Sequence, residues 1–73
     1  MGQIKDDKLL QKVADRIKQI REHNNITQEV FYNDIGIHIA RIEARKANIS
    51  LSTLNAICKY FQMSLSEFFS EID

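Results

Sequence analysis

The scarcity of helix-breaking residues constrains this sequence most. Its 73 residues contain no proline and only two glycines, Gly2 and Gly36. Proline and glycine are the residues least compatible with a helix interior, so a chain nearly free of them favours helices joined by short turns. At this length most apolar positions are needed for packing rather than for enclosing a cavity. We therefore expect a single all-α domain spanning residues 1–73.

The first helix is expected from about residue 6 to residue 23. Its apolar residues recur at three- and four-residue spacing, which is typical of an amphipathic helix with one face on the core. These residues are Leu9 or Leu10, Val13, Ile17 and Ile20. Asp6 and Asp7 suit the positive end of the helix dipole, and Asn24 and Asn25 suit the left-handed conformation in which many helices finish.

Two short helices are expected next, on either side of Gly36. Thr27 can cap the second helix, which runs through Phe31, because its hydroxyl accepts from a free backbone amide. Residues 33–36 are expected to form a turn in which Gly36 takes a positive φ. The third helix then covers roughly residues 37–45, with apolar and basic side chains on opposite faces. These side chains are Ile39 and Ile42, and Arg41 and Arg45.

A fourth and a fifth helix are expected after a loop at residues 47–50. Their candidate N-caps are Ser50 or Ser52 and Ser64 or Ser66. Glu67 completes a capping-box pattern with Ser64, which supports Ser64 as the start of the fifth helix. The side chains that we expect to face inward from these two helices are Leu54, Ile57, Cys58, Phe61, Leu65, Phe68 and Phe69. Phe68, Phe69 and Ile72 either close the core or form a self-association surface.

Several functional classes find no support in the residues. No nucleophile–base pair, phosphate-binding glycine loop or carboxylate pair is visible, so we expect no catalytic or cofactor site. His23 and His38 are isolated and no cysteine pair exists, which argues against a metal site. Cys58 is the only cysteine, so it is expected to be a small buried residue in a cytoplasmic protein. No apolar run is long enough to cross a bilayer, and no signal peptide is recognisable.

The net charge is formally zero, which counts against a nucleic-acid binder. Its distribution is uneven, however. Residues 1–60 hold all ten Lys and Arg against seven acids, a balance of +3, whereas residues 61–73 hold three acids and no base, a balance of −3. An acidic C-terminal end can therefore lie apart from a more basic face, although such asymmetry is weak support for DNA binding.

Four short motifs occur in a characteristic order. They are Thr27-Gln28-Glu29, Ile39-Ala40-Arg41-Ile42-Glu43, Asn48-Ile49-Ser50-Leu51-Ser52-Thr53-Leu54 and Ser64-Leu65-Ser66-Glu67-Phe68. Together they resemble the phage repressor and Cro-type, or XRE-like, helix-turn-helix family, from about residue 9 to residue 69. The resemblance implies a compact five-helix lambda-repressor-like DNA-binding domain, with a short N-terminal extension and an acidic C-terminal end.

The resemblance also implies roles for individual residues. In this family the helix after the turn enters the major groove and its N-terminal end touches base edges. Those positions here are Gly36, Ile37, His38 and Arg41. The Gln that opens the preceding helix contacts a phosphate, as does the loop after the recognition helix. These positions are Gln28, and Arg45, Lys46 and Asn48. The resemblance further implies that Glu43 pairs with Arg21.

Elementary chemistry supports some of these roles and leaves alternatives open. If residues 37–45 are helical, Ile37 and Arg41 share one face. Arg41 can then bond guanine O6 and N7, and Ile37 can contact a thymine methyl. Arg41 can equally form a surface ion pair, His38 can be a turn or cap residue, and Gln28 can be only a helix-opening residue.

The sequence departs from the family pattern near the turn. The spacing of fifteen residues from Gln28 to Glu43 is shorter than the family usually has, and we expect the loss to cut the second helix or tighten the turn. Phe31 and Tyr32 stand where a small Ala is usual, and Arg45 stands where a Gly usually ends the recognition helix.

Two functions are consistent with the sequence. The first is a sequence-specific DNA-binding transcriptional regulator, which reads double-stranded DNA as a homodimer on a two-fold operator. The alternative is an antitoxin-like or adaptor domain that binds a protein partner and has weak or no DNA binding. The zero net charge, the short spacing and the apolar Ile37 favour the alternative.

Overall fold

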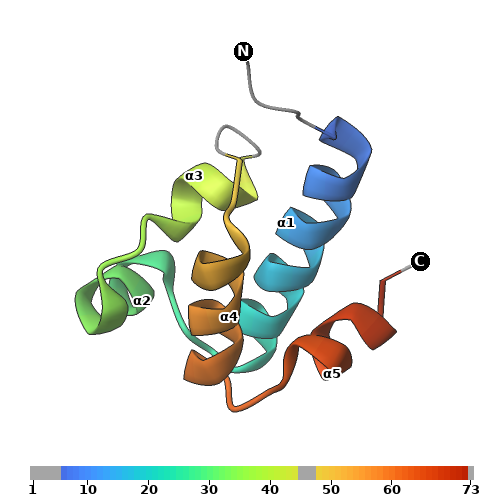
Figure 1. Cartoon of the computed structure of the whole chain (residues 1–73). Coiled ribbons are helices and arrows are strands. Elements are labelled where there is room, and N and C mark those ends of the chain that lie inside the picture. Colours follow the sequence, from blue (N-terminus) through green and yellow to red (C-terminus); the bar gives the residue numbers. More distant parts are fainter. Residues whose placement is uncertain (1–5, 45–47, 73) are drawn as a thin grey trace.

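The computed structural model describes residues 6–44 and 48–72, and these residues form five helices with no strand. The helices are α1 (Asp7–His23), α2 (Gln28–Ile35), α3 (Ile39–Glu43), α4 (Leu51–Tyr60) and α5 (Leu65–Ser70). In Figure 1, α2 and α3 lie together on one side of α4, and α5 lies on its other side. The expected all-α, five-helix fold is confirmed.

Side-chain caps explain where most of these helices begin. In α1, α2, α4 and α5 the residue before the helix accepts a hydrogen bond from a backbone N–H in the first turn. The caps are Asp6, Thr27, Ser50 and Ser64, with donor–acceptor distances of 3.0 to 3.1 Å. Ser64 and Glu67 form the full capping box. The expected cap at Thr27 is confirmed, and of the two serines considered for each later helix, Ser50 and Ser64 are the caps.

The core lies between the inner faces of all five helices. Its fully buried side chains include Ile17 of α1, Phe31 of α2 and Phe68 of α5. On α1 the expected apolar face is present, with Leu10 buried and Leu9 exposed. Cys58 is also buried, as expected, and this burial raises the pKa of its thiol.

Phe31 anchors α2 to the C-terminal end of α4. It is the only buried residue of α2, and its ring centroid lies 4.9 Å from that of Tyr60 and 5.8 Å from that of Phe61. The Tyr60 hydroxyl donates to the carboxylate of Asp34, and this hydrogen bond raises the pKa of Tyr60. The bulky Phe31 is therefore accommodated because α4 offers it an aromatic site.

The boundaries around the turn differ from expectation. Residues 33–35 were expected in the turn, but α2 continues through Ile35 and Gly36 is its C-cap. Gly36 has φ of 71°, a left-handed conformation that ends a helix. Its N–H donates to the carbonyl of Tyr32 at 2.7 Å. The expected positive φ at Gly36 is confirmed, and α2 itself extends over eight residues.

The third helix is shorter than expected at both ends. Ile37 was expected inside it, but His38, with φ of −77° and ψ of 77°, is the N-cap and α3 begins at Ile39. Ile37 and Arg41 therefore do not share a helix face, which corrects the sequence interpretation. The helix ends at Glu43, and Arg45 and Lys46 lie outside the described residues. A three-residue connection and a five-residue α3 together account for the short spacing between Gln28 and Glu43.

We predict that Phe31→Ala lowers the free energy of unfolding by about 3 to 5 kcal/mol, because it removes a fully buried ring and leaves a cavity. Phe31→Leu, which keeps an apolar side chain, loses less. Urea unfolding followed by far-ultraviolet circular dichroism measures both. Tyr32→Ala is the matched control, since that ring lies on the same helix and is 43% exposed. Equal losses at the two positions would contradict the role of Phe31 as the anchor of α2.

Candidate nucleic-acid interface

The segment from α2 to α3 forms two helices joined by a tight connection. Only residues 36–38 separate the end of α2 from the start of α3, and the two helices pack against each other. Gly36, in the left-handed conformation, ends α2. A second helix set at a sharp angle after such a short turn is the geometry of helix-turn-helix DNA-binding motifs.

α3 has one buried and one exposed side. Ile39 and Ile42 are buried in the core, while Arg41 and Ala40 are exposed. This arrangement confirms the opposite placement of Ile39 and Ile42 against Arg41. A helix of only five residues has almost no stability of its own, so its position is set by what it packs against.

A shallow hollow beside α3 brings together four of the residues expected to contact DNA. These are Ile37, His38, Arg41 and Asn48. The hollow has a volume of about 250 Å³ and continues onto Ser50 and Thr53 at the start of α4. The structure therefore gathers side chains from the turn, from α3 and from the loop before α4. Gly36 is exposed nearby at the end of α2, and Gln28 lies at the opposite end of α2.

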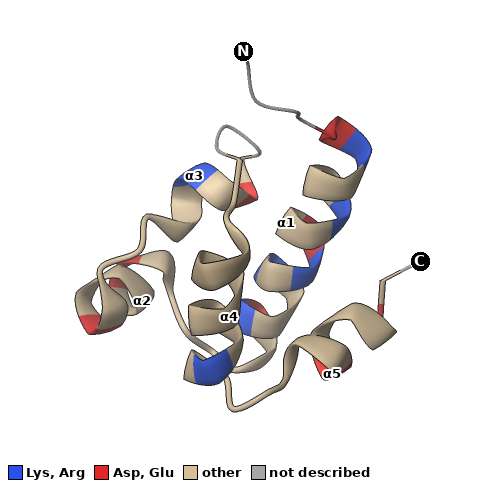
Figure 2. Ribbon diagram, in the orientation of Figure 1, with Lys and Arg blue, Asp and Glu red and all other residues tan. Residues whose placement is uncertain are grey.

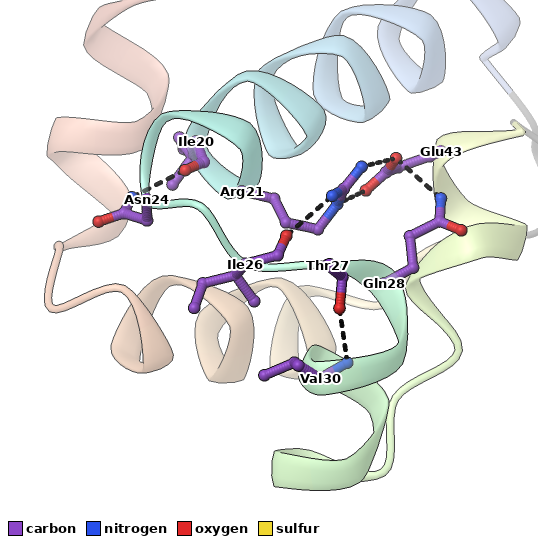
Figure 3. A network of polar contacts seen from close by, with 8 residues as sticks. All are labelled: Ile20, Arg21, Asn24, Ile26, Thr27, Gln28, Val30 and Glu43. Carbon is purple, nitrogen blue, oxygen red and sulfur yellow. Dashed lines mark hydrogen bonds and ion pairs between the residues drawn. The ribbon is translucent and has the colours of Figure 1, made fainter.

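A polar network fixes the C-terminal end of α3 (Figure 3). The Arg21 guanidinium donates through Nε to Glu43 Oε2 at 2.7 Å and through Nη2 to Glu43 Oε1 at 3.0 Å. Its Nη1 donates to the carbonyl oxygen of Ile26 at 2.8 Å. Gln28 Nε2 donates to the same carboxylate at 3.1 Å. The Arg21–Glu43 pair implied by the family resemblance is therefore present.

This network is shielded from water and charged. The Arg21 and Glu43 side chains are 10% and 6% exposed, so their attraction is little screened. The hydrogen bonds that Arg21 donates to Glu43 raise the pKa of the Arg21 guanidinium, which keeps it charged. Because the network joins the end of α1, the start of α2 and the end of α3, it sets the relative positions of these three helices.

The electrostatic character of the surface is uneven (Figure 2). α1 carries a series of basic residues, Lys8, Lys12, Arg16, Lys18 and Arg21. α2 carries Glu29 and Asp34 and no Lys or Arg. In the described part of the α2–α3 segment, Arg41 is the only Lys or Arg. Within the described part of this segment, Arg41 is therefore the positive side chain available to an anion.

Sequence reasoning missed Tyr32 at this site. Its ring centroid lies 4.4 Å from that of His38, and the two ring planes are inclined by 33°. From the sequence, Tyr32 was noted only as a bulky residue in the second helix. The signal in the sequence is the pair of aromatic side chains, Tyr32 and His38, on either side of Gly36. Their contact depends on the angle between the two helices at the turn, and residue spacing does not give that angle.

A comparison with protein-family models identifies the class of the chain. A helix-turn-helix family model matches residues 17–68, which include all of α2, α3 and α4. This protein belongs to the XRE-like helix-turn-helix family. That family consists of DNA-binding regulators and is not a family of enzymes. Searches of curated proteins and of solved structures found no match to the chain.

Membership of the helix-turn-helix family assigns names to the elements described above. α2 and α3 are the two helices of the motif, and α3 is the one that follows the turn, at the position of a recognition helix. No helix among residues 6–44 and 48–72 is long and apolar enough to span a membrane.

We predict that Glu43→Gln lowers the free energy of unfolding by about 3 kcal/mol, because it leaves the mostly buried charge of Arg21 without a balancing carboxylate. Thermal and urea unfolding of the variant measure the loss. Glu71→Gln makes the same chemical change at an exposed position and is expected to leave stability almost unaltered. Similar stability of the two variants would show that the Arg21–Glu43 pair contributes little.

Proposed function

We propose that this protein is a sequence-specific transcriptional regulator that reads the major groove with α3 and binds a two-fold operator as a homodimer. The observation that supports this most is the placement of Arg41. It is exposed on α3, whose opposite face is buried through Ile39 and Ile42, and it borders the hollow that His38 and Asn48 also line. A recognition helix needs this separation of a packed side from a polar, accessible side.

Each residue of the proposed interface has a distinct chemical role. Arg41 donates to O6 and N7 of a guanine, and Ile37 packs on a thymine methyl. His38 bonds a base edge through a ring nitrogen, next to the exposed backbone of Gly36. Asn48 lies on the phosphate side, and Arg45 and Lys46 are proposed to add positive charge there.

Gln28 is proposed to link the network to the DNA backbone. Its amide nitrogen has two N–H groups, of which one donates to Glu43. The second donates to no group in residues 6–44 and 48–72, and we propose that it donates to a phosphate oxygen. The same side chain then holds the end of α3 through Glu43 and positions the domain on the duplex through a phosphate.

The proposed mechanism of regulation is steric. A dimer bound at a promoter-proximal site occupies DNA that polymerase needs, or places a surface where polymerase can contact it. Occupancy then depends on protein concentration or on a protein partner.

A groove lined by exposed apolar side chains supports the proposed homodimer. Leu9 of α1, Leu51 of α4 and Phe69 of α5 are 47%, 68% and 39% exposed, and all three border one groove of about 340 Å³. Exposed apolar groups gathered in one place favour association. Since a two-fold operator requires two copies of the domain, we propose a second copy as the occupant.

We predict that Leu51→Asp converts the dimer to a monomer in sedimentation equilibrium. Leu51 opens α4, and an acidic residue in the first turn of a helix is favourable, so the fold is retained. Ser52→Asp adds the same charge at the next position, outside the groove lining, and is expected to remain dimeric. A monomeric wild type, or equal behaviour of both variants, would refute this interface.

The alternative function, an adaptor or antitoxin-like domain, is favoured by one specific observation. α2 carries acidic residues and no Lys or Arg, whereas a DNA-binding surface is normally basic. Under this alternative the fold is retained for a protein partner. The two functions differ in whether the protein binds DNA at low salt.

The deciding experiment is a titration of the protein against a duplex enriched from a random pool and against an unrelated duplex, each at two salt concentrations. We predict that Arg41→Ala loses roughly 10- to 100-fold in affinity for the enriched duplex, as expected for removal of one bidentate base contact. Its affinity for the unrelated duplex changes far less.

Lys59→Ala is the matched control for that experiment. It also removes one positive charge, from the C-terminal end of α4 rather than from α3. We expect it to bind the enriched duplex like the wild type. An equal loss in both variants would mean that Arg41 acts only through its charge. No binding by the wild type even at low salt would favour the adaptor alternative.

A further inference from the structure

Few polar side chains are available for base reading along the described part of the recognition segment, residues 36–44. Ala40 and Ala44 carry no hydrogen-bonding side chain, and Glu43 is bonded to Arg21 and Gln28. His38 and Arg41 are therefore the two exposed side chains in this range that can hydrogen-bond to a base edge. Any discrimination between base pairs by hydrogen bonding from this range, beyond that of Arg41, therefore depends largely on His38.

His38 is not held by the backbone in the way that Arg41 is. It precedes α3 as the N-cap, with a non-helical ψ of 77°, and its side chain makes no capping hydrogen bond. An exposed imidazole in such a position ordinarily samples several rotamers. Each rotamer that does not face the groove lowers the affinity of base recognition, because binding must restrict the side chain.

Tyr32 provides the missing support. Its ring centroid lies 4.4 Å from that of His38 with the planes inclined by 33°, which is contact distance for two aromatic rings. The contact spans the turn, because Tyr32 belongs to α2 and His38 to the start of α3. It is therefore the contact that can restrict the imidazole from outside its own segment.

Tyr32 is itself firmly placed but is not needed for the core. It follows the buried anchor Phe31, and its carbonyl accepts the Gly36 N–H at 2.7 Å. Its own side chain is 43% exposed. Since so much of this ring remains in solvent, burial does not explain its position as well as its contact with His38 does.

We propose that Tyr32 is a positioning residue for base recognition, which holds the His38 imidazole over the turn in the orientation that reads one base pair of the operator. This inference rests on the proposed DNA-reading function. Tyr32 touches no base in this role. It acts through His38, and its ring rather than its hydroxyl is the part that matters.

The test compares base preferences of variants by sequencing duplexes enriched from a random pool. The wild type and His38→Ala first locate the base pair that depends on His38. We expect Tyr32→Ala to reduce discrimination at that base pair roughly 3- to 10-fold, the range expected from losing one aromatic pair. Tyr32→Phe keeps the ring and is expected to keep the discrimination. Preference at the base pair read by Arg41 stays unchanged in every Tyr32 variant.

Coupling between the two residues provides a second readout. If Tyr32 acts through His38, the double variant Tyr32→Ala/His38→Ala discriminates no worse than His38→Ala alone. Val30→Ala, which truncates another exposed residue of α2, is the matched control and leaves the profile unaltered. In proton NMR of the free protein, the ring-current shift of the His38 protons disappears in Tyr32→Ala and persists in Tyr32→Phe.

The outcomes separate the two proposals. If the wild type enriches no sequence, the regulator function fails, and this inference fails with it. If the wild type enriches a site but Tyr32→Ala discriminates as well as the wild type, only the positioning role is overturned. Additive losses of discrimination in the double variant would also overturn the positioning role. An equal loss of discrimination in Tyr32→Phe and Tyr32→Ala would overturn it too, because the hydroxyl would then be the active group.

Discussion

The bidentate ion pair between Arg21 and Glu43 is the interaction on which the arrangement of the motif depends. The two residues are 22 positions apart in the chain, and their pair closes the segment that contains all of α2, the turn and α3. Arg21 also binds the carbonyl of Ile26, and Gln28 binds Glu43. One carboxylate therefore links the end of α1, the start of α2 and the end of α3.

The importance of this pair follows from the length of α3. Five residues form little more than one turn, and such a peptide is not helical in isolation. Ile39 and Ile42 hold its inner face by apolar packing, which is strong but not directional. The Arg21–Glu43 pair adds directional hydrogen bonds that fix the C-terminal end of α3. The left-handed Gly36 and the N-cap His38 fix its N-terminal end.

Much of the fold was predictable from the sequence because it is encoded locally. The periodicity of α1 and the hydroxyl caps at Thr27, Ser50 and Ser64 depend on residues within one or two turns. The boundaries near Gly36 were not predicted. α2 ends only at the left-handed Gly36, and α3 begins only after His38, whose backbone is not helical.

The candidate site shows the same division between local and spatial information. The resemblance to a known family placed Ile37, His38, Arg41 and Asn48 in one interface, and the structure places all four around one hollow. Their roles in binding remain proposals. Gln28 was expected either to contact a phosphate or only to open its helix, and its bond to Glu43 was not foreseen. The Tyr32–His38 contact was also missed, because it depends on how two elements meet across the turn.

The shortness of α3 has a consequence for how much information one domain can extract from DNA. Under the proposed function, a helix that offers Arg41, with His38 just before it, directly distinguishes few base pairs, so many sites in a genome would satisfy a single domain. Selectivity would then come from requiring two half-sites at a fixed separation, or from the deformability of the DNA between them. In evolutionary terms, the preferred sequence can be altered at two exposed positions without disturbing the buried residues that hold the fold together.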